Sequence, residues 1–96
     1  MALTDEAIDK IKQMIISGRV RPGEKLPREA DLAAELGLSR NSLREAVKAL
    51  SLINVLDVRQ GDGTYATSLA SKLLFALAAA EVLRRKRAWF EAELAI

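Results

Sequence analysis

The chain has 96 residues, of which 50% are hydrophobic and 29% are charged, and its formal net charge is +2. This length allows one small domain with a modest core, and the apolar fraction argues against a disordered chain. Cysteine and histidine are both absent, which excludes disulfides, thiol catalysis and a histidine metal site. We therefore expect no metal and no other cofactor, and the lack of cysteine favours an intracellular, cytoplasmic protein.

The charges are divided unevenly along the chain. Residues 1–67 contain ten basic and ten acidic residues, whereas residues 68–96 contain five basic and three acidic ones. A nucleic-acid partner therefore has to be argued from where particular charges point, because overall basicity does not indicate one. A membrane protein is not expected either, since the longest apolar run, residues 73–80, is too short to cross a bilayer.

Two helices are predicted in the first 36 residues. Thr4 is followed by two acidic residues and suits a helix N-cap, isoleucines then recur at helical spacing, and Gly18 suits the end of that helix. The turn region 19–27 contains a Pro-Gly pair and has room only for a very short strand. A second helix is predicted over residues 28–36.

The next residues predict a helix-turn-helix. Gly37 suits the left-handed residue just past the second helix, and Ser39 suits the N-cap of a third helix over residues 39–53. Ala33 is small enough to let the two helices approach, and Leu43 is placed to lock the third helix against the second.

A hairpin is predicted after the third helix. Asn54 suits a left-handed residue at the helix end. Strand-forming residues follow over 55–58 and again over 64–67, with the flexible turn Gly-Asp-Gly between them. This order of elements predicts a winged helix, mainly α-helical with a small β-hairpin, whose wing covers residues 58–66. From Ser68 onward the pattern is helical again.

Two basic side chains indicate what the third helix does. Arg40 and Arg44 are one turn apart at its leading end, so both can project from one face. A guanidinium can pair with O6 and N7 of guanine, which is worth ~1–3 kcal/mol of discrimination. The alternatives are surface arginines paired with carboxylates such as Glu45, and a winged helix used for protein contacts. The DNA-reading interpretation requires both guanidinium groups to face outward without an intramolecular carboxylate partner.

Three segments carry a resemblance to a known family. They read IISGRVRPGEKLP at residues 15–27, LAAELGLSRNSLREAVKAL at residues 32–50 and VRQGDGTYAT at residues 58–67. In these segments the chain resembles the DNA-binding domain of GntR-type bacterial transcription regulators. The resemblance implies a repressor or activator that binds a short pseudo-palindromic operator in double-stranded DNA as a homodimer. It also implies a C-terminal domain that senses a small metabolite.

The resemblance assigns roles to single residues. Arg40 and Arg44 match base-reading arginines, and Gln60 and Gly61 match a wing tip that reaches the minor groove. Ala30 departs from the family, which usually has a phosphate-contacting arginine at that position, so Arg28 is considered as its substitute. The candidate DNA-binding residues are Arg28, Ser39, Arg40, Asn41, Ser42, Arg44, Gln60 and Gly61.

Residues 68–96 form a linker and a helical segment after the winged-helix domain of residues 1–67. Residues 87–95, RAWFEAELA, resemble the first helix of the effector domain in the FadR-like branch, so the chain is either truncated there or a stand-alone DNA-binding module. A small-molecule effector is expected only if a further C-terminal domain exists. Apolar side chains in this segment predict self-association or folding back onto the winged helix; they are Leu73, Leu74, Phe75, Leu77, Val82, Leu83, Trp89, Phe90 and Leu94.

An enzyme is not expected. The chain has no phosphate-cradling glycine loop and no paired carboxylates placed for acid–base work, in addition to its lack of histidine and cysteine.

Overall fold

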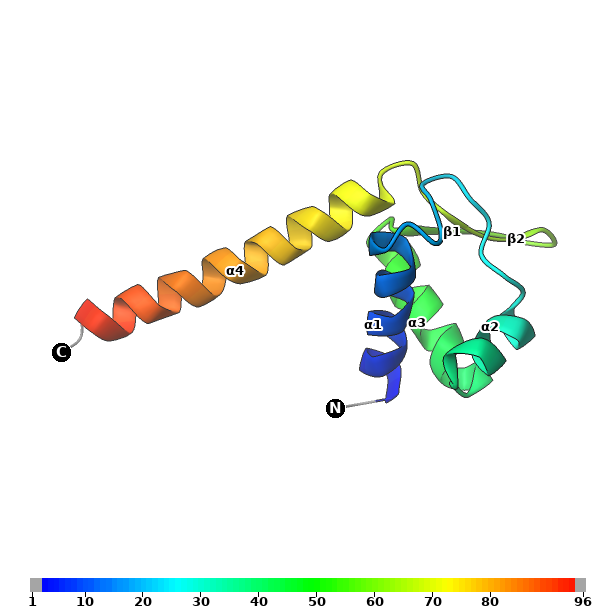
Figure 1. The fold of residues 1–96 in the computed structure, drawn as a ribbon, viewed down its shortest axis with the longest axis horizontal. Coiled ribbons are helices and arrows are strands. Elements are labelled where there is room, and N and C mark those ends of the chain that lie inside the picture. The colour runs from blue at the N-terminus through cyan, green and yellow to red at the C-terminus, as the bar shows by residue number, and fades with distance from the viewer. Residues whose placement is uncertain (1–2, 95–96) are drawn as a thin grey trace.

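The computed structural model describes the backbone of residues 3–94 and the side chains of residues 3–88 and 91. Three helices pack together, a hairpin extends from one side of them, and a long helix projects from the other (Figure 1). This is the predicted winged helix with a C-terminal helical segment. Its elements are α1 (Leu3–Ile16), α2 (Glu29–Leu36), α3 (Arg40–Leu52), β1 (Leu56–Arg59), β2 (Gly63–Ala66) and α4 (Ala70–Leu94).

The core lies where α1, α2 and α3 meet the base of the hairpin. Its largest fully buried side chains come from all of these parts: Ile11, Leu32, Leu43, Leu50 and Val55. Burying an aliphatic side chain of this size contributes roughly 1.5–3 kcal/mol relative to leaving it in water. The apolar faces predicted for the three helices therefore hold the domain together.

The ends of α1 differ slightly from the prediction. The helix already includes Leu3, so Thr4 lies inside it and the predicted N-cap is wrong. The acidic residues Asp5 and Glu6 do lie in its first turn, where negative charge is favourable next to the helix N-terminus. Gly18 adopts the left-handed conformation, with φ of 83°, two residues after the helix ends.

The turn between α2 and α3 is built as predicted. Gly37 is left-handed, with φ of 66°, and the N–H group of Leu38 donates to the carbonyl of Ala33 over 2.9 Å. Ser39 is the N-cap of α3, because its hydroxyl accepts from the N–H group of Ser42 over 3.1 Å. The first residue of α2 is Glu29, and Arg28, which was predicted to be helical, is its N-cap.

The hairpin is a two-stranded antiparallel sheet of β1 and β2. A third segment, before α2, pairs with β2 through an isolated bridge. Asn54 is left-handed, with φ of 63°, as predicted. Leu56 pairs with Ala66 and Arg59 pairs with Gly63, so residues 60–62 form the tip. The predicted very short strand exists as a single bridge from Lys25 to Tyr65. This bridge fixes the segment before α2 against the outer side of β2.

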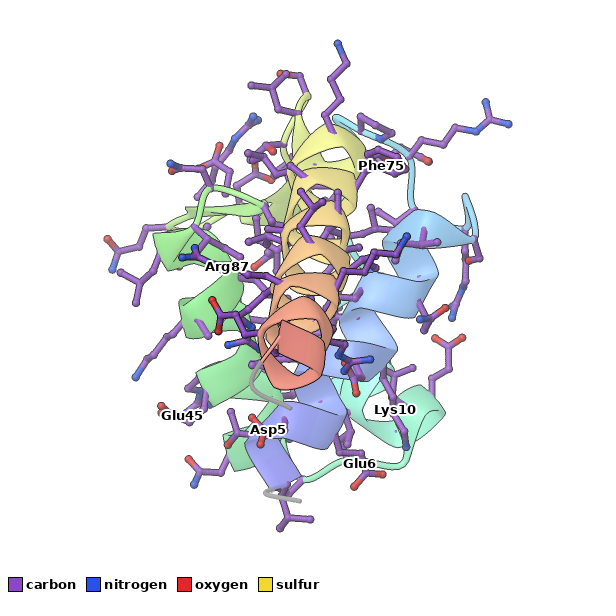
Figure 2. The ribbon with its side chains drawn as sticks, turned by 90° about the vertical axis from the view of Figure 1, so that its left-hand side faces the viewer. Asp5, Glu6, Lys10, Glu45, Phe75 and Arg87 are labelled. Atoms are coloured by element: carbon purple, nitrogen blue, oxygen red, sulfur yellow. The ribbon has the colours of Figure 1, made fainter. Side chains whose placement is uncertain are left out.

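Among the side chains that the structure describes, those that anchor the long helix α4 lie at its beginning. Ala70 and Leu74 are buried in the core, and the helix then leaves the domain (Figure 1). Phe75 is 77% exposed and Leu83 is 68% exposed, so of the two alternatives predicted for this segment, folding back onto the winged helix is not seen for the described side chains beyond Leu74. Figure 2, which looks along α4, shows Phe75 near its start and Arg87 nearer its end.

The predictions for the side chains of Trp89, Phe90 and Leu94 lie outside the described side chains. Within the described part of the chain, no helix combines the length and the apolar character needed to cross a membrane.

Candidate nucleic-acid interface

The leading turn of α3 places most of the predicted residues at the surface. Ser39, Arg40 and Asn41 are exposed, and Arg40 has no ion pair with any residue that the structure describes. Ser42 is different, since it is only 8% exposed and its hydroxyl receives a hydrogen bond from that of Ser39 at 2.9 Å. The side chain of Ser42 thus completes the helix cap and is not presented to a partner.

Arg44 is not free, contrary to the expectation from the sequence. Its Nη2 atom lies 2.9 Å from Oε1 of Glu29, the first residue of α2. Glu45, which was considered from the sequence as a partner for Arg40, instead lies 3.5 Å from Nζ of Lys48. The requirement that both guanidinium groups lack a carboxylate partner is therefore met by Arg40 and not by Arg44.

The exposure of the Arg44–Glu29 pair decides whether it obstructs DNA binding. The two side chains are 56% and 44% exposed, and solvent-exposed ion pairs of this kind contribute about 0–1 kcal/mol. A bidentate contact with guanine is worth ~1–3 kcal/mol. The pair is therefore weaker than the contact that the sequence assigns to Arg44, and it leaves that role physically accessible.

A groove of about 500 Å³ runs between α2, α3 and the hairpin. Its floor is apolar and includes Leu32, Leu43 and Val47. Arg28 and Arg44 both line it, although they lie on different elements, and so does Lys48, one turn beyond Arg44. Arg28 is exposed at the N-terminus of α2 and makes no capping hydrogen bond with its side chain. The structure thus brings Arg28, the candidate substitute for the arginine missing at Ala30, beside α3.

The wing tip carries Gln60 and Gly61, both exposed. Two links hold this tip that the sequence did not reveal. Nζ of Lys25 lies 3.1 Å from Oδ1 of Asp62, and the hydroxyl of Tyr65 donates to Oδ2 of the same carboxylate over 2.8 Å. We call these three residues, Lys25, Asp62 and Tyr65, the wing clasp. It ties the tip of the hairpin to the segment before α2.

A glycine and an arginine complete the environment of the wing clasp. A Cβ atom at Gly63 would lie 2.5 Å from Cε of Lys25, so a side chain there would displace the end of the Lys25 side chain. The guanidinium of Arg59 lies over the ring of Tyr65, 4.0 Å from its centroid, and its Nε atom lies 3.1 Å from Oδ2 of Asp57. The sequence signal that could have indicated this cluster is the Gly-Asp-Gly turn. Its aspartate, Asp62, has two carboxylate oxygens, one of which accepts from Lys25 and the other from Tyr65.

We expect the wing clasp to make the order of the wing depend on pH. The hydrogen bond from Tyr65, and then the one from Lys25, lower the pKa of Asp62. Because the pKa is lower in the folded state, the stabilisation is complete above the unfolded value of about 3.9 and is lost as the pH falls through the folded value. We predict that Asp62→Asn removes this acid-dependent loss and speeds amide hydrogen exchange at Gln60 and Gly61 near neutral pH. Glu45→Gln, which lies on α3 outside the hairpin and pairs with Lys48, is the control and should leave exchange at the tip unchanged.

Comparison with known proteins agrees with this geometry. Residues 3–66 match the family described as bacterial regulatory proteins, gntR family. The chain is 43% identical over 63 residues to the HTH-type transcriptional regulator Mce2R of Mycobacterium tuberculosis, covering 66% of this chain and 26% of that protein. The chain spans about a quarter of the length of the curated relatives it matches.

Solved structures show the same arrangement. The DNA-binding domain of AraR, crystallised in complex with operator ORR3, superposes with a TM-score of 0.64 at 28% identity, covering 70% of this chain and 81% of that one. A GntR family transcriptional regulator from Listeria monocytogenes covers all of this chain and 85% of its own, with a TM-score of 0.77. At 20% identity, that second likeness shows the fold alone.

The matched family is described as regulatory proteins and Mce2R as a transcriptional regulator, in agreement with the prediction that this chain is not an enzyme. With most of the winged helix inside the matched segment and the recognition helix at its centre, the chain belongs to the gntR family of bacterial regulatory proteins, and residues 3–66 are its winged-helix DNA-binding domain.

Proposed function

We propose that this chain is the sequence-reading part of a cytoplasmic transcription regulator that binds a pseudo-palindromic operator as a homodimer. The observation that carries the proposal is the leading turn of α3, where Arg40 is exposed and unpaired among the described residues and Arg44 has only an exposed partner. A recognition helix of this kind enters the major groove by its N-terminal end. Both guanidinium groups would then read guanines.

The remaining candidate residues receive supporting roles. Ser39 and Asn41, exposed at the start of α3, suit phosphate oxygens, which position a protein on the duplex without reading its sequence. Gln60 and Gly61 at the wing tip are proposed to reach the minor groove. Arg28 is proposed to supply the backbone contact that Ala30 does not make.

Selection from random duplexes tests the proposal. We expect an enriched pseudo-palindrome with guanines in both half-sites, and a steep fall in affinity as the salt concentration rises, because bound phosphates release counterions. A winged helix used for protein contacts would enrich no sequence and would show no salt dependence. That pair of results would contradict DNA reading by this chain.

The exposed part of α4 supports the homodimer. Residues 73–83 contain one charged side chain, Glu81, and otherwise only apolar ones, so this stretch of the helix is apolar on nearly every side. A helix of that kind is normally buried against other protein. We propose that a second copy of the chain covers it.

Replacing Phe75 and Leu83 together by glutamate is expected to give a monomer. Separate monomers lose the gain from binding two half-sites at once, which is about 10²–10⁴ in affinity, so operator binding should fall by that order while the winged helix stays folded. Mass can be measured by light scattering and affinity by fluorescence anisotropy. Lys72→Glu, at an exposed position of the same helix, is the control and should remain dimeric. A wild-type chain that is monomeric at every concentration tested would contradict self-association.

We further propose that residues 1–67 form the DNA-binding domain, that residues 68–96 lead into an effector domain, and that the protein belongs to the FadR-like branch. The support is the segment at residues 87–95, in which Nε of Arg87 lies 3.2 Å from Oε1 of Glu91 one turn later on α4. A small-molecule effector follows only from such a domain. A metal site made of histidines in that domain would need residues beyond these 96, since this chain has no histidine.

A further inference from the structure

The contact between Glu29 and Arg44 joins the first turn of α2 to the recognition helix. It is made by a single atom of each side chain, Oε1 of Glu29 and Nη2 of Arg44, at 2.9 Å. Both residues line the groove between α2, α3 and the hairpin, together with the basic residues Arg28 and Lys48. A carboxylate on a surface that receives DNA repels phosphates. Its presence there calls for a role that outweighs this repulsion.

We propose that Glu29 is a specificity-determining residue, which restrains Arg44 from binding the phosphates of random DNA and leaves it able to read a guanine. The proposal rests on the proposed function, because it requires Arg44 to face the duplex. In this proposal Glu29 helps to discriminate the operator from random DNA without contacting a base itself.

The geometry of a guanidinium explains why Glu29 treats the two kinds of DNA differently. The group has five N–H donors in a planar fork, and a carboxylate that binds one nitrogen leaves other donors free. Arg44 can therefore pair with O6 and N7 of guanine while it keeps Glu29. We infer that Arg44 has to leave Glu29 to reach a phosphate of random DNA, and the carboxylate repels that phosphate as well. The loss of the Arg44–Glu29 pair therefore weakens the binding of random DNA and not the binding of the operator.

Glu29→Gln tests the proposal because it removes the charge and keeps the shape of the side chain. We expect affinity for a random duplex to rise about two- to fivefold, the range that corresponds to an exposed ion pair. The salt dependence on the random duplex should steepen by about one phosphate contact. Affinity for the selected operator should stay equal or fall, so the ratio of specific to non-specific affinity decreases. Fluorescence anisotropy with the complete 96-residue chain measures both.

Two further variants separate this effect from a general gain in positive charge. Glu35→Gln makes the same change in the same helix and releases Arg19, with which Glu35 forms an ion pair; it should leave the affinity ratio unchanged. In an Arg44→Ala background, Glu29→Gln should raise the affinity for random DNA less than it does in the wild type, because only the direct repulsion between Glu29 and phosphates is then removed. An undiminished rise in that background, or an equal rise with Glu35→Gln, would overturn the proposal. Melting temperatures check that each variant is folded.

The failure of this inference is distinguishable from failure of the proposed function. If Arg44→Ala leaves operator binding unchanged, the base-reading role of Arg44 is wrong and the role of Glu29 is wrong with it. If Arg44→Ala weakens operator binding while Glu29→Gln leaves the affinity for random DNA unchanged, only the role of Glu29 is wrong.

Discussion

Arg44→Ala should weaken operator binding about 30-fold to 10⁴-fold and leave the melting temperature nearly unchanged. Each half-site loses a contact worth ~1–3 kcal/mol, and a dimer makes it twice. Folding loses little, because the only interaction of Arg44 that the structure describes is the exposed pair with Glu29, worth about 0–1 kcal/mol. A gel-shift titration and a thermal melt measure the two quantities. The loss should be much smaller on a random duplex.

Lys48→Ala is the matched control for this prediction. Lys48 lies one turn further along α3, lines the same groove and pairs only with Glu45 among the described residues. We expect it to contact the DNA backbone, so its loss should reduce affinity modestly and by the same factor for every sequence. Equal operator affinity of the wild type and Arg44→Ala would show that Arg44 does not read DNA.

Leu43→Ala, one residue earlier, should have the opposite effect. Leu43 is 1% exposed and packs in the core between α2 and α3. Truncating a buried leucine to alanine costs about 2–5 kcal/mol, which is a large part of the ~5–15 kcal/mol that holds a small domain together. We therefore expect the melting temperature to fall by about 10 °C or more. Urea unfolding gives the free energy directly.

The control for Leu43→Ala is Leu52→Ala at the other end of α3. Leu52 is 83% exposed, and surface substitutions away from special features usually change stability by less than about 0.5 kcal/mol. The Leu43→Ala protein that remains folded at low temperature should still recognise the operator, because its guanidinium groups are intact. A fall in affinity without a fall in stability would mean that Leu43 acts on DNA binding in another way.

The sequence predicted the parts of the fold that depend on neighbouring residues. Gly37 and Asn54 were expected to be left-handed and Ser39 was expected to cap α3, and all three predictions are confirmed. Such features depend on the conformational preference of one residue or on a hydrogen bond within one turn. The order of elements followed from them, and so did the winged helix.

The interactions that the sequence missed join residues far apart in the chain. Arg44 finds its partner 15 residues earlier in α2, and Lys25 finds Asp62 37 residues later. Neither pair follows from spacing along a helix, because each depends on how two elements are placed in space. The burial of Ser42 was missed for a related reason, since its hydroxyl belongs to the cap that Ser39 forms. The surface residues of the site are therefore predictable as a set, but not their pairings.

The burial of the first turn of α4 in the core determines how a change in its direction is expressed along its length. Its 25 residues make a rod roughly 38 Å long, and its fixed end, at Ala70 and Leu74, lies in the same core as the recognition helix. A tilt of the helix by about 10° at this buried turn would move its distal end sideways by ~6 Å, about the pitch of one helical turn. Because Ala70 and Leu74 share one core with Leu43 of α3, we expect a partner that repositions the distal part of α4 to reorient the winged helix with it.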